Sequence, residues 1–140
     1  MPVWTSAGAH RYYIEEEQIY VELHGDLGAA DLQVMWDAAE KIEDTYGYVI
    51  CVFDVQRSNG VSADCRKYVG ERNRKRTILG SVVMIGANIV VRTLTRLLNQ
   101  ATLLRGKKPS PVFFCNIVEE VPAIVAEQRR AHAPLRKAPR

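Results

Sequence analysis

The 140-residue chain lacks the features that mark several protein classes. Its first residues, MPVWTSAGAH, have no basic flank followed by an apolar run, so the sequence predicts no secretory signal. No apolar stretch approaches the ~18 residues that a membrane-spanning helix needs. These two absences lead us to expect a cytoplasmic protein.

Cysteine and histidine are scarce, with three of each. Cys51 and Cys115 lie in apolar runs and no CxxC pair occurs, so we expect reduced, buried thiols and no metal site. The chain also lacks G-x-S-x-G, G-x-x-x-x-G-K and H-E-x-x-H, the motifs of common hydrolases and nucleotide-binding proteins. Because His24 has no adjacent nucleophile or paired carboxylate, we expect neither catalysis nor a cofactor.

Charge is unevenly distributed along the chain. The formal net charge is +3, yet five of the 19 basic residues lie beyond residue 128 with no acid among them. The remaining 14 basic residues are outnumbered by 16 acidic residues, so the rest of the chain is slightly acidic. A nucleic-acid interface favours basic residues interleaved with aromatic ones, which this tail lacks, so we do not expect nucleic acid as a partner.

Residues 10–131 predict one α/β domain, between a flexible lead-in (1–9) and a solvated basic tail (132–140). Alternation and apolar runs predict strands over residues 10–14, 19–24, 48–54, 78–85 and 111–115. Helical spacing predicts helices over 29–46, 63–76, 89–104 and 119–131. The order β-β-α-β-α-β-α-β-α predicts a mixed β-sheet with an opening antiparallel hairpin, later parallel strands, and helices packed on it.

Of the four expected helices, those at 29–46 and 89–104 carry a clear apolar stripe, whereas the helix at 63–76 does not. Residues 63–76 are crowded with Arg and Lys, so we expect that helix to lie mostly at the surface. The stripe of the helix at 89–104 is explained by core packing, with a lid over an apolar pocket as the alternative. The stripes comprise Leu32, Met35, Trp36, Ala39, Ile42 and Tyr46 in the first helix, and Val90, Val91, Leu94, Leu97, Leu98 and Ala101 in the third.

Several segments carry a resemblance to a known family. GDL follows the second strand, the third strand ends in FDV, VVMIGANIVVRTLTRLL covers the next strand and helix, and PVFF forms the last strand. With Asp54, Gly86 and Arg92, these segments resemble the STAS-like domains related to the sporulation anti-sigma factor antagonists, over about residues 11–131. Stand-alone bacterial domains of this kind are often grouped with STAS and CRAL-TRIO-type folds.

The resemblance implies a partner-binding switch. In typical STAS domains a partner kinase phosphorylates a Ser or Thr at the start of the helix that follows the Asp54-equivalent strand. The matching residue here is Ser62. The usual Asp-Ser-(Ser/Thr)-Gly run is absent and the loop is longer.

The candidate binding residues follow the third and fourth strands, because open parallel sheets bind ligands beyond the carboxyl ends of their strands. N–H groups at two helix starts would hold a carboxylate or phosphate, with nearby arginines adding charge. The alternative is that Ser62 and Asn88 only cap their helices. The expected surface comprises Asp54, Arg57, Ser58, Asn59, Ser62, Arg66, Asn88 and Arg92.

Two functional hypotheses follow from these observations. The first is a non-enzymatic regulatory module that binds an unidentified protein partner through residues 57–62 and the second helix. The alternative is a carrier of a lipid or another small apolar ligand. A homodimer is also expected, because Trp4, Tyr12 and Tyr13 lie near an edge strand and need covering.

Overall fold

The secondary structure follows the expected element order, with one additional strand. The computed structural model describes residues 2–104, 106 and 110–137, without the side chains of residues 89–90, 93–94, 97–98 and 101–102. Its strands are β1 (Thr5–Ala7), β2 (His10–Glu15), β3 (Gln18–Leu27), β4 (Val49–Val61), β5 (Gly80–Ile85) and β6 (Val112–Cys115). Its α-helices are α1 (Ala29–Tyr46), α2 (Ala63–Lys75), α3 (Ile89–Leu104) and α4 (Val121–Ala131).

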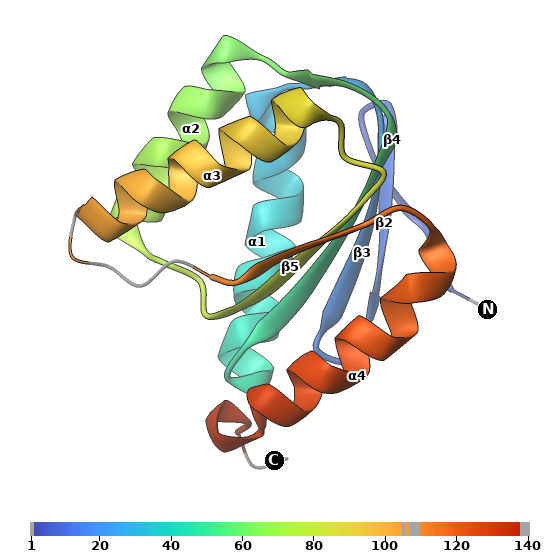
Figure 1. The fold of residues 1–140 in the computed structure, drawn as a ribbon, viewed down its shortest axis with the longest axis vertical. Coiled ribbons are helices and arrows are strands. Elements are labelled where there is room, and N and C mark those ends of the chain that lie inside the picture. The colour runs from blue at the N-terminus through green and yellow to red at the C-terminus, as the bar shows by residue number, and fades with distance from the viewer. Residues whose placement is uncertain (1, 105, 107–109, 138–140) are drawn as a thin grey trace.

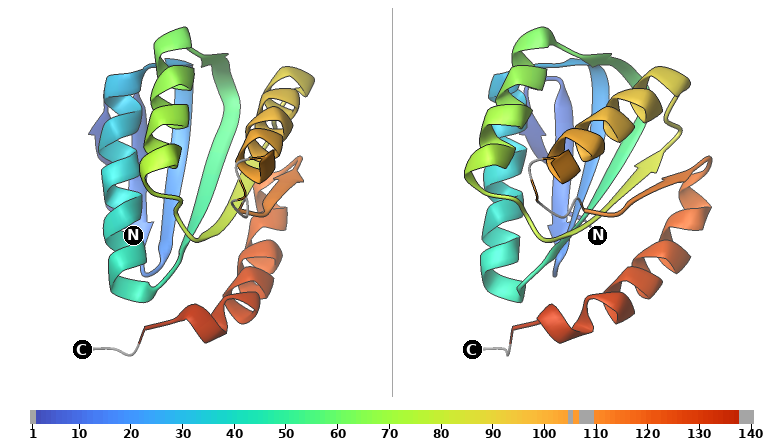
Figure 2. Two further views of the ribbon diagram at one scale, coloured as in Figure 1. Left: turned by 90° about the vertical axis from the view of Figure 1, so that its left-hand side faces the viewer. Right: turned by 60° about the vertical axis from the view of Figure 1, so that its left-hand side comes forward.

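The six strands form one mixed sheet in the order β1-β2-β3-β4-β5-β6. The first two pairs are antiparallel and the last three are parallel, which confirms the expected fold class. Parallel connections are right-handed, and here each moves one strand further in the same direction. All three crossover helices therefore lie on one face, and α4 covers part of the other (Figures 1 and 2).

Two apolar clusters lie on either side of the sheet. Val49 belongs to the cluster on the side of α1 and α2, whereas Ile50 and Val52 pack with Val121 and Val125 of α4. This alternation along β4 follows from the pleat of a strand. β4 is therefore covered on both faces.

Two expectations about the sheet are wrong. The lead-in over residues 1–9 contains β1, which pairs antiparallel with β2. Gly8 lies in the turn between them with a φ of +63, and Ala7 of β1 is buried at 4% exposure. The expected polar loop after residue 54 is instead a continuation of β4 to Val61. It pairs with the end of β3 through two register shifts, which let polar side chains remain at the rim of the sheet.

The basic tail is anchored to the domain where the structure describes it, through residue 137, although residues 133–137 remain exposed. The carboxylate of Glu17 is fully buried and receives a hydrogen bond from Arg129 Nε and a second, at 3.0 Å, from Arg136. The Lys137 amide donates to the Tyr46 carbonyl at 2.8 Å and so satisfies the end of α1. Arg129 of α4 and Arg136 of the tail therefore compensate the charge of a buried acid.

The basic run of α2 likewise has a structural role that the sequence did not indicate. Arg72 lies 2.6 Å from a carboxylate oxygen of Asp37 and 2.8 Å from one of Glu40, and Arg76 lies 2.7 Å from one of Asp44. These ion pairs tie α2 to α1. Arg72 of α2 and Arg76, the C-terminal cap of this helix, are therefore already paired with acidic residues of α1.

We expect loss of the arginine partners of Glu17 to destabilise the fold. The double variant Arg129→Ala/Arg136→Ala leaves a buried carboxylate without compensation, which costs about 3–5 kcal/mol in comparable cases. Because both arginines are partly exposed, we expect a value at the lower end in urea unfolding. The control Arg130→Ala changes an exposed neighbour and should stay within about 0.5 kcal/mol of wild type. Equal stability of the double variant and the control would contradict this account.

Candidate binding site at the starts of α2 and α3

A polar cavity lies where β3 and β4 end and where α2 and α3 begin. Its volume is about 320 Å³. Four of the eight predicted binding residues line it, from the end of β4, the start of α2 and the residue before α3, so the structure does bring half of the expected surface together. The described lining residues are Asp26, Asn59, Gly60, Val61, Ser62, Arg66, Asn88 and Val91.

Ser62 caps the start of α2, as predicted. Its hydroxyl accepts a hydrogen bond from the Cys65 amide at 3.2 Å and donates one to Asp64. The hydrogen bond from Ser62, together with bonds from backbone N–H groups including that of Ala29, holds the pKa of the Asp64 carboxyl below its usual range. The starts of α1 and α2 thus already share one carboxylate.

Asn88 caps the start of α3, also as predicted. Its side-chain oxygen accepts from the Val91 amide at 3.0 Å. Arg92 is not among the described residues that line the polar cavity. Its Nε donates to the Ala87 carbonyl at 3.0 Å, and its guanidinium lies 4.9 Å from the centre of the Phe114 ring. The first turn of α3 contains no acidic residue. This helix start therefore keeps its positive end uncompensated by its own side chains.

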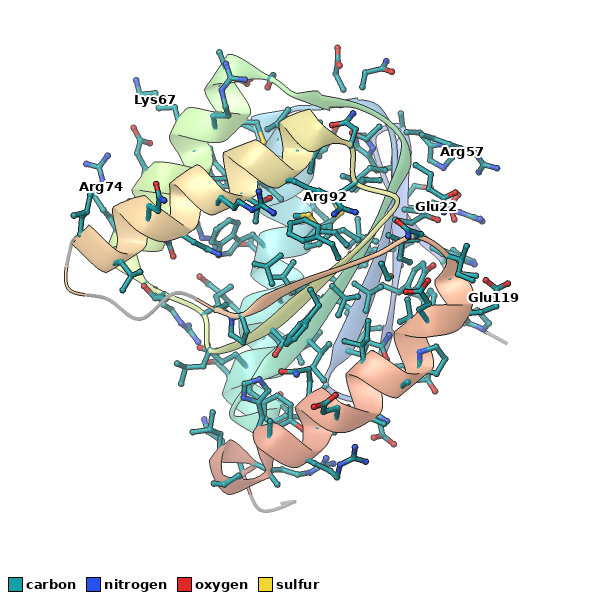
Figure 3. All side chains as sticks on the ribbon, in the orientation of Figure 1. Glu22, Arg57, Lys67, Arg74, Arg92 and Glu119 are labelled. Atoms are coloured by element: carbon teal, nitrogen blue, oxygen red, sulfur yellow. The ribbon has the colours of Figure 1, made fainter. Side chains whose placement is uncertain are left out.

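Asp54, Arg57 and Ser58 do not line the polar cavity. Arg57 reaches Glu22 at 3.5 Å, and Figure 3 shows this pair far from Lys67 and Arg74 of α2. Asp54 accepts a hydrogen bond from the Gln56 amide two residues on. The expected surface is therefore divided, since side chains alternate along β4 and the strand extends beyond its predicted end.

A larger apolar cavity of about 480 Å³ lies between α1, α2, α3 and the sheet. Apolar side chains supply most of its wall, including Leu23, Met35 and Phe53. Val91, Thr95 and Asn99 form the described stripe of α3 on this cavity, at intervals of four residues. The side chains of Val90, Leu94, Leu97, Leu98 and Ala101, which the sequence places in the stripe of this helix, lie outside the described residues.

Two thiols line the apolar cavity and stay protonated at neutral pH. Burial raises the pKa of Cys51 to about 12 and, with the nearby charge of Asp64, that of Cys65 to about 11. The cysteines that the structure describes are free. Among the described residues, no group of three or more His, Cys, Asp or Glu side chains is placed to hold a metal ion. No described helix has the length and apolar character required to cross a membrane.

One polar group on the other face of the sheet escaped the sequence analysis. Glu22 of β3 accepts hydrogen bonds from Arg11 at 3.0 Å and, in one tautomer, from His24 at 2.8 Å. Burial opposes ionisation of Glu22, but these two partners outweigh it and lower the pKa of the carboxyl. Alternation along β2 and β3 was the available signal, because it places Arg11 and Glu22 opposite each other on one face.

Comparison with known proteins bears on the fold. No protein-family model matches the chain, and no curated protein does. The anti-sigma factor antagonist SpoIIAA in its unphosphorylated form aligns with a TM-score of 0.57 and 13% identity, over 85% of this chain and 98% of that chain. An uncharacterised DUF3478 protein with a SpoIIAA-like fold, from Shewanella loihica, aligns with a TM-score of 0.56 and 14% identity, over 89% of this chain and 91% of its own.

This chain has a SpoIIAA-like fold. The structural part of the predicted STAS-like resemblance is thereby confirmed, including the opening hairpin and the parallel strands that follow. At this level of identity the likeness concerns the SpoIIAA-like fold alone, since one fold supports many functions.

We expect Ser62→Ala to lower the free energy of unfolding by about 1 kcal/mol, because it removes the cap of α2. Urea unfolding followed by circular dichroism measures the change. Ser62→Asn is the matched control, since asparagine caps helices as well as serine does and should retain most of the stability. Equal losses in the two variants would show that the cap is not what Ser62 contributes.

Proposed function

We propose that the protein is a non-enzymatic, cytoplasmic regulatory module that binds another protein, as STAS-type domains do. The SpoIIAA-like fold carries this proposal, because the SpoIIAA structure is that of an anti-sigma factor antagonist. The position of Ser62 adds to this proposal. Ser62 lies at the start of α2 beside a cavity, at the place where the STAS resemblance puts the regulated residue.

The proposed contact surface is the segment 59–62 with the outward side of α2. Arg66, Lys67, Arg74 and Lys75 are all exposed on that helix. Figure 3 shows Lys67 and Arg74 extending away from the body of the protein. A basic surface of this kind favours a partner with an acidic face, since complementary charge steers association.

Ser62 is the proposed regulated residue of this surface. A phosphate would add a charge of about −1.5 to −2 beside the basic side of α2 and would remove the hydroxyl that now donates to Asp64. The helix dipole stabilises that charge and the Asp64 carboxylate opposes it. Because the added charge repels an acidic partner, phosphorylation would weaken the complex.

Charge reversal on α2 tests the protein-binding proposal. Immobilised wild-type protein and the variant Lys67→Glu/Arg74→Glu are compared by quantitative mass spectrometry of proteins recovered from a source lysate. We expect recovery of the specific partner to fall by about tenfold or more, because each reversed charge repels an acidic face. Arg130→Glu, at an exposed position of α4, is the control and should retain the partner. Equal recovery by all three proteins would assign the contact to another surface.

A second candidate function is the binding of a lipid or another small apolar ligand. The apolar cavity of about 480 Å³ favours it. Well-packed interiors contain few voids larger than a water molecule, whereas ligand sites commonly measure about 300–1,000 Å³. The cavity is therefore far larger than a packing defect and has the size of a ligand site.

Native mass spectrometry of freshly purified protein tests this second candidate, and we expect a bound mass beyond that of the polypeptide. Gly70 lines the cavity, and a Cβ added there would meet no atom within 4 Å. Gly70→Leu should therefore fill the cavity without disturbing α2 and abolish the added mass. Glu71→Leu places the same side chain on the exposed side and should retain it. A clean apo mass for wild type, or added mass in the Gly70 variant, would count against a ligand here.

A further inference from the structure

One charged side chain distinguishes the wall of the apolar cavity. Among the described residues that line this cavity, Arg66 alone carries a charge at neutral pH. The remaining described lining is apolar or neutral and polar. A cavity with this composition offers one electrostatic anchor, and that anchor is a cation.

Arg66 lies where the two cavities meet. It lines both of them, as do Val61 and Val91. One guanidinium nitrogen donates to the Val61 carbonyl at 3.1 Å. Its other N–H groups have no partner within the part of the chain that the structure describes, and arginine presents five such donors in a planar fork that matches a carboxylate or phosphate.

The surroundings of Arg66 reinforce a preference for negative charge. The start of α3 lines the polar cavity through Asn88, and the first turn of this helix lacks an acidic residue. Two carboxylates lie in the area. Asp64 is already engaged by Ser62 and backbone amides, and Asp26 is exposed and lines the polar cavity but not the apolar one. Among the described lining residues, Arg66 is therefore the charged side chain that the two cavities share.

We propose that the ligand of the apolar cavity is a single-chain amphiphile with one acidic head group. The chain lies against the apolar wall, and the head group pairs with Arg66 at the junction of the two cavities. This inference rests on the second candidate function above and adds the chemical class of the ligand. A charge-assisted pair with arginine supplies orientation as well as affinity, because the rest of the wall would accept the chain in either direction.

Ligands that differ only in their head group test the inference. Dodecanoate, dodecanol and dodecylamine are titrated into delipidated full-length protein at neutral pH, below the concentration at which each aggregates, by isothermal calorimetry. We expect dodecanoate to bind about tenfold more tightly than dodecanol, as one additional charge-assisted hydrogen-bonded pair allows, and dodecylamine to bind most weakly.

Two variants separate the head-group contact from the cavity itself. Arg66→Gln should remove the advantage of dodecanoate and leave the affinity for dodecanol within about twofold of wild type, since the apolar wall is unchanged. Lys67→Gln removes a neighbouring exposed charge that is not part of the described cavity lining and should retain the advantage.

The outcomes distinguish this inference from the function on which it rests. If dodecanol binds as well as dodecanoate, or if Arg66→Gln keeps the preference for the acid, the head-group assignment is wrong while ligand binding stands. If the folded protein binds none of the three compounds, the second candidate function fails and the inference fails with it.

Discussion

The direction of the parallel connections is the constraint on which the remaining structure depends. From β3 to β6 each crossover advances by one strand in the same sense, so right-handedness places α1, α2 and α3 on a single face. Three helices then have to cover one side of a twisted sheet, and only α4 remains for the other. The same arrangement brings the ends of β3 and β4 together with the starts of α2 and α3. Both cavities follow from this geometry. The polar cavity lies where neighbouring crossovers begin, and the apolar cavity lies beneath it, between the three helices and the sheet.

Crowding three helices onto one face has an energetic consequence. The apolar cavity is open to solvent along part of its boundary, so its apolar wall is exposed to water. Exposed apolar area costs free energy in proportion to its extent. An apolar chain that lies against the wall removes this area from water and adds van der Waals contact. The cavity therefore favours a bound molecule on energetic grounds, independently of any likeness to other proteins.

Local sequence signals predicted the elements well, and long-range contacts account for what they missed. The stripe of α1 and the caps Ser62 and Asn88 each depend on residues within a few positions of one another. Glu17 and Arg129 are 112 residues apart, and nothing near either residue indicates that they meet. The division of the predicted surface has a similar cause, since continued pairing with β3 extends β4 and places Arg57 beside Glu22. A cavity leaves no mark in the sequence at all, because the same apolar stripe serves a filled core equally well.

The two candidate functions are physically connected through Arg66. This residue lines both cavities and also belongs to the exposed basic side of α2, a few positions from Ser62. A ligand that engages the Arg66 guanidinium changes the charge that α2 presents to a partner. Any difference in ligand affinity between free and partner-bound protein appears, by thermodynamic reciprocity, as an equal difference in partner affinity, and such couplings commonly amount to about 1–3 kcal/mol. A SpoIIAA-like fold with a cavity next to α2 thus needs no moving domain to connect ligand occupancy with partner binding, because one shared arginine provides the connection.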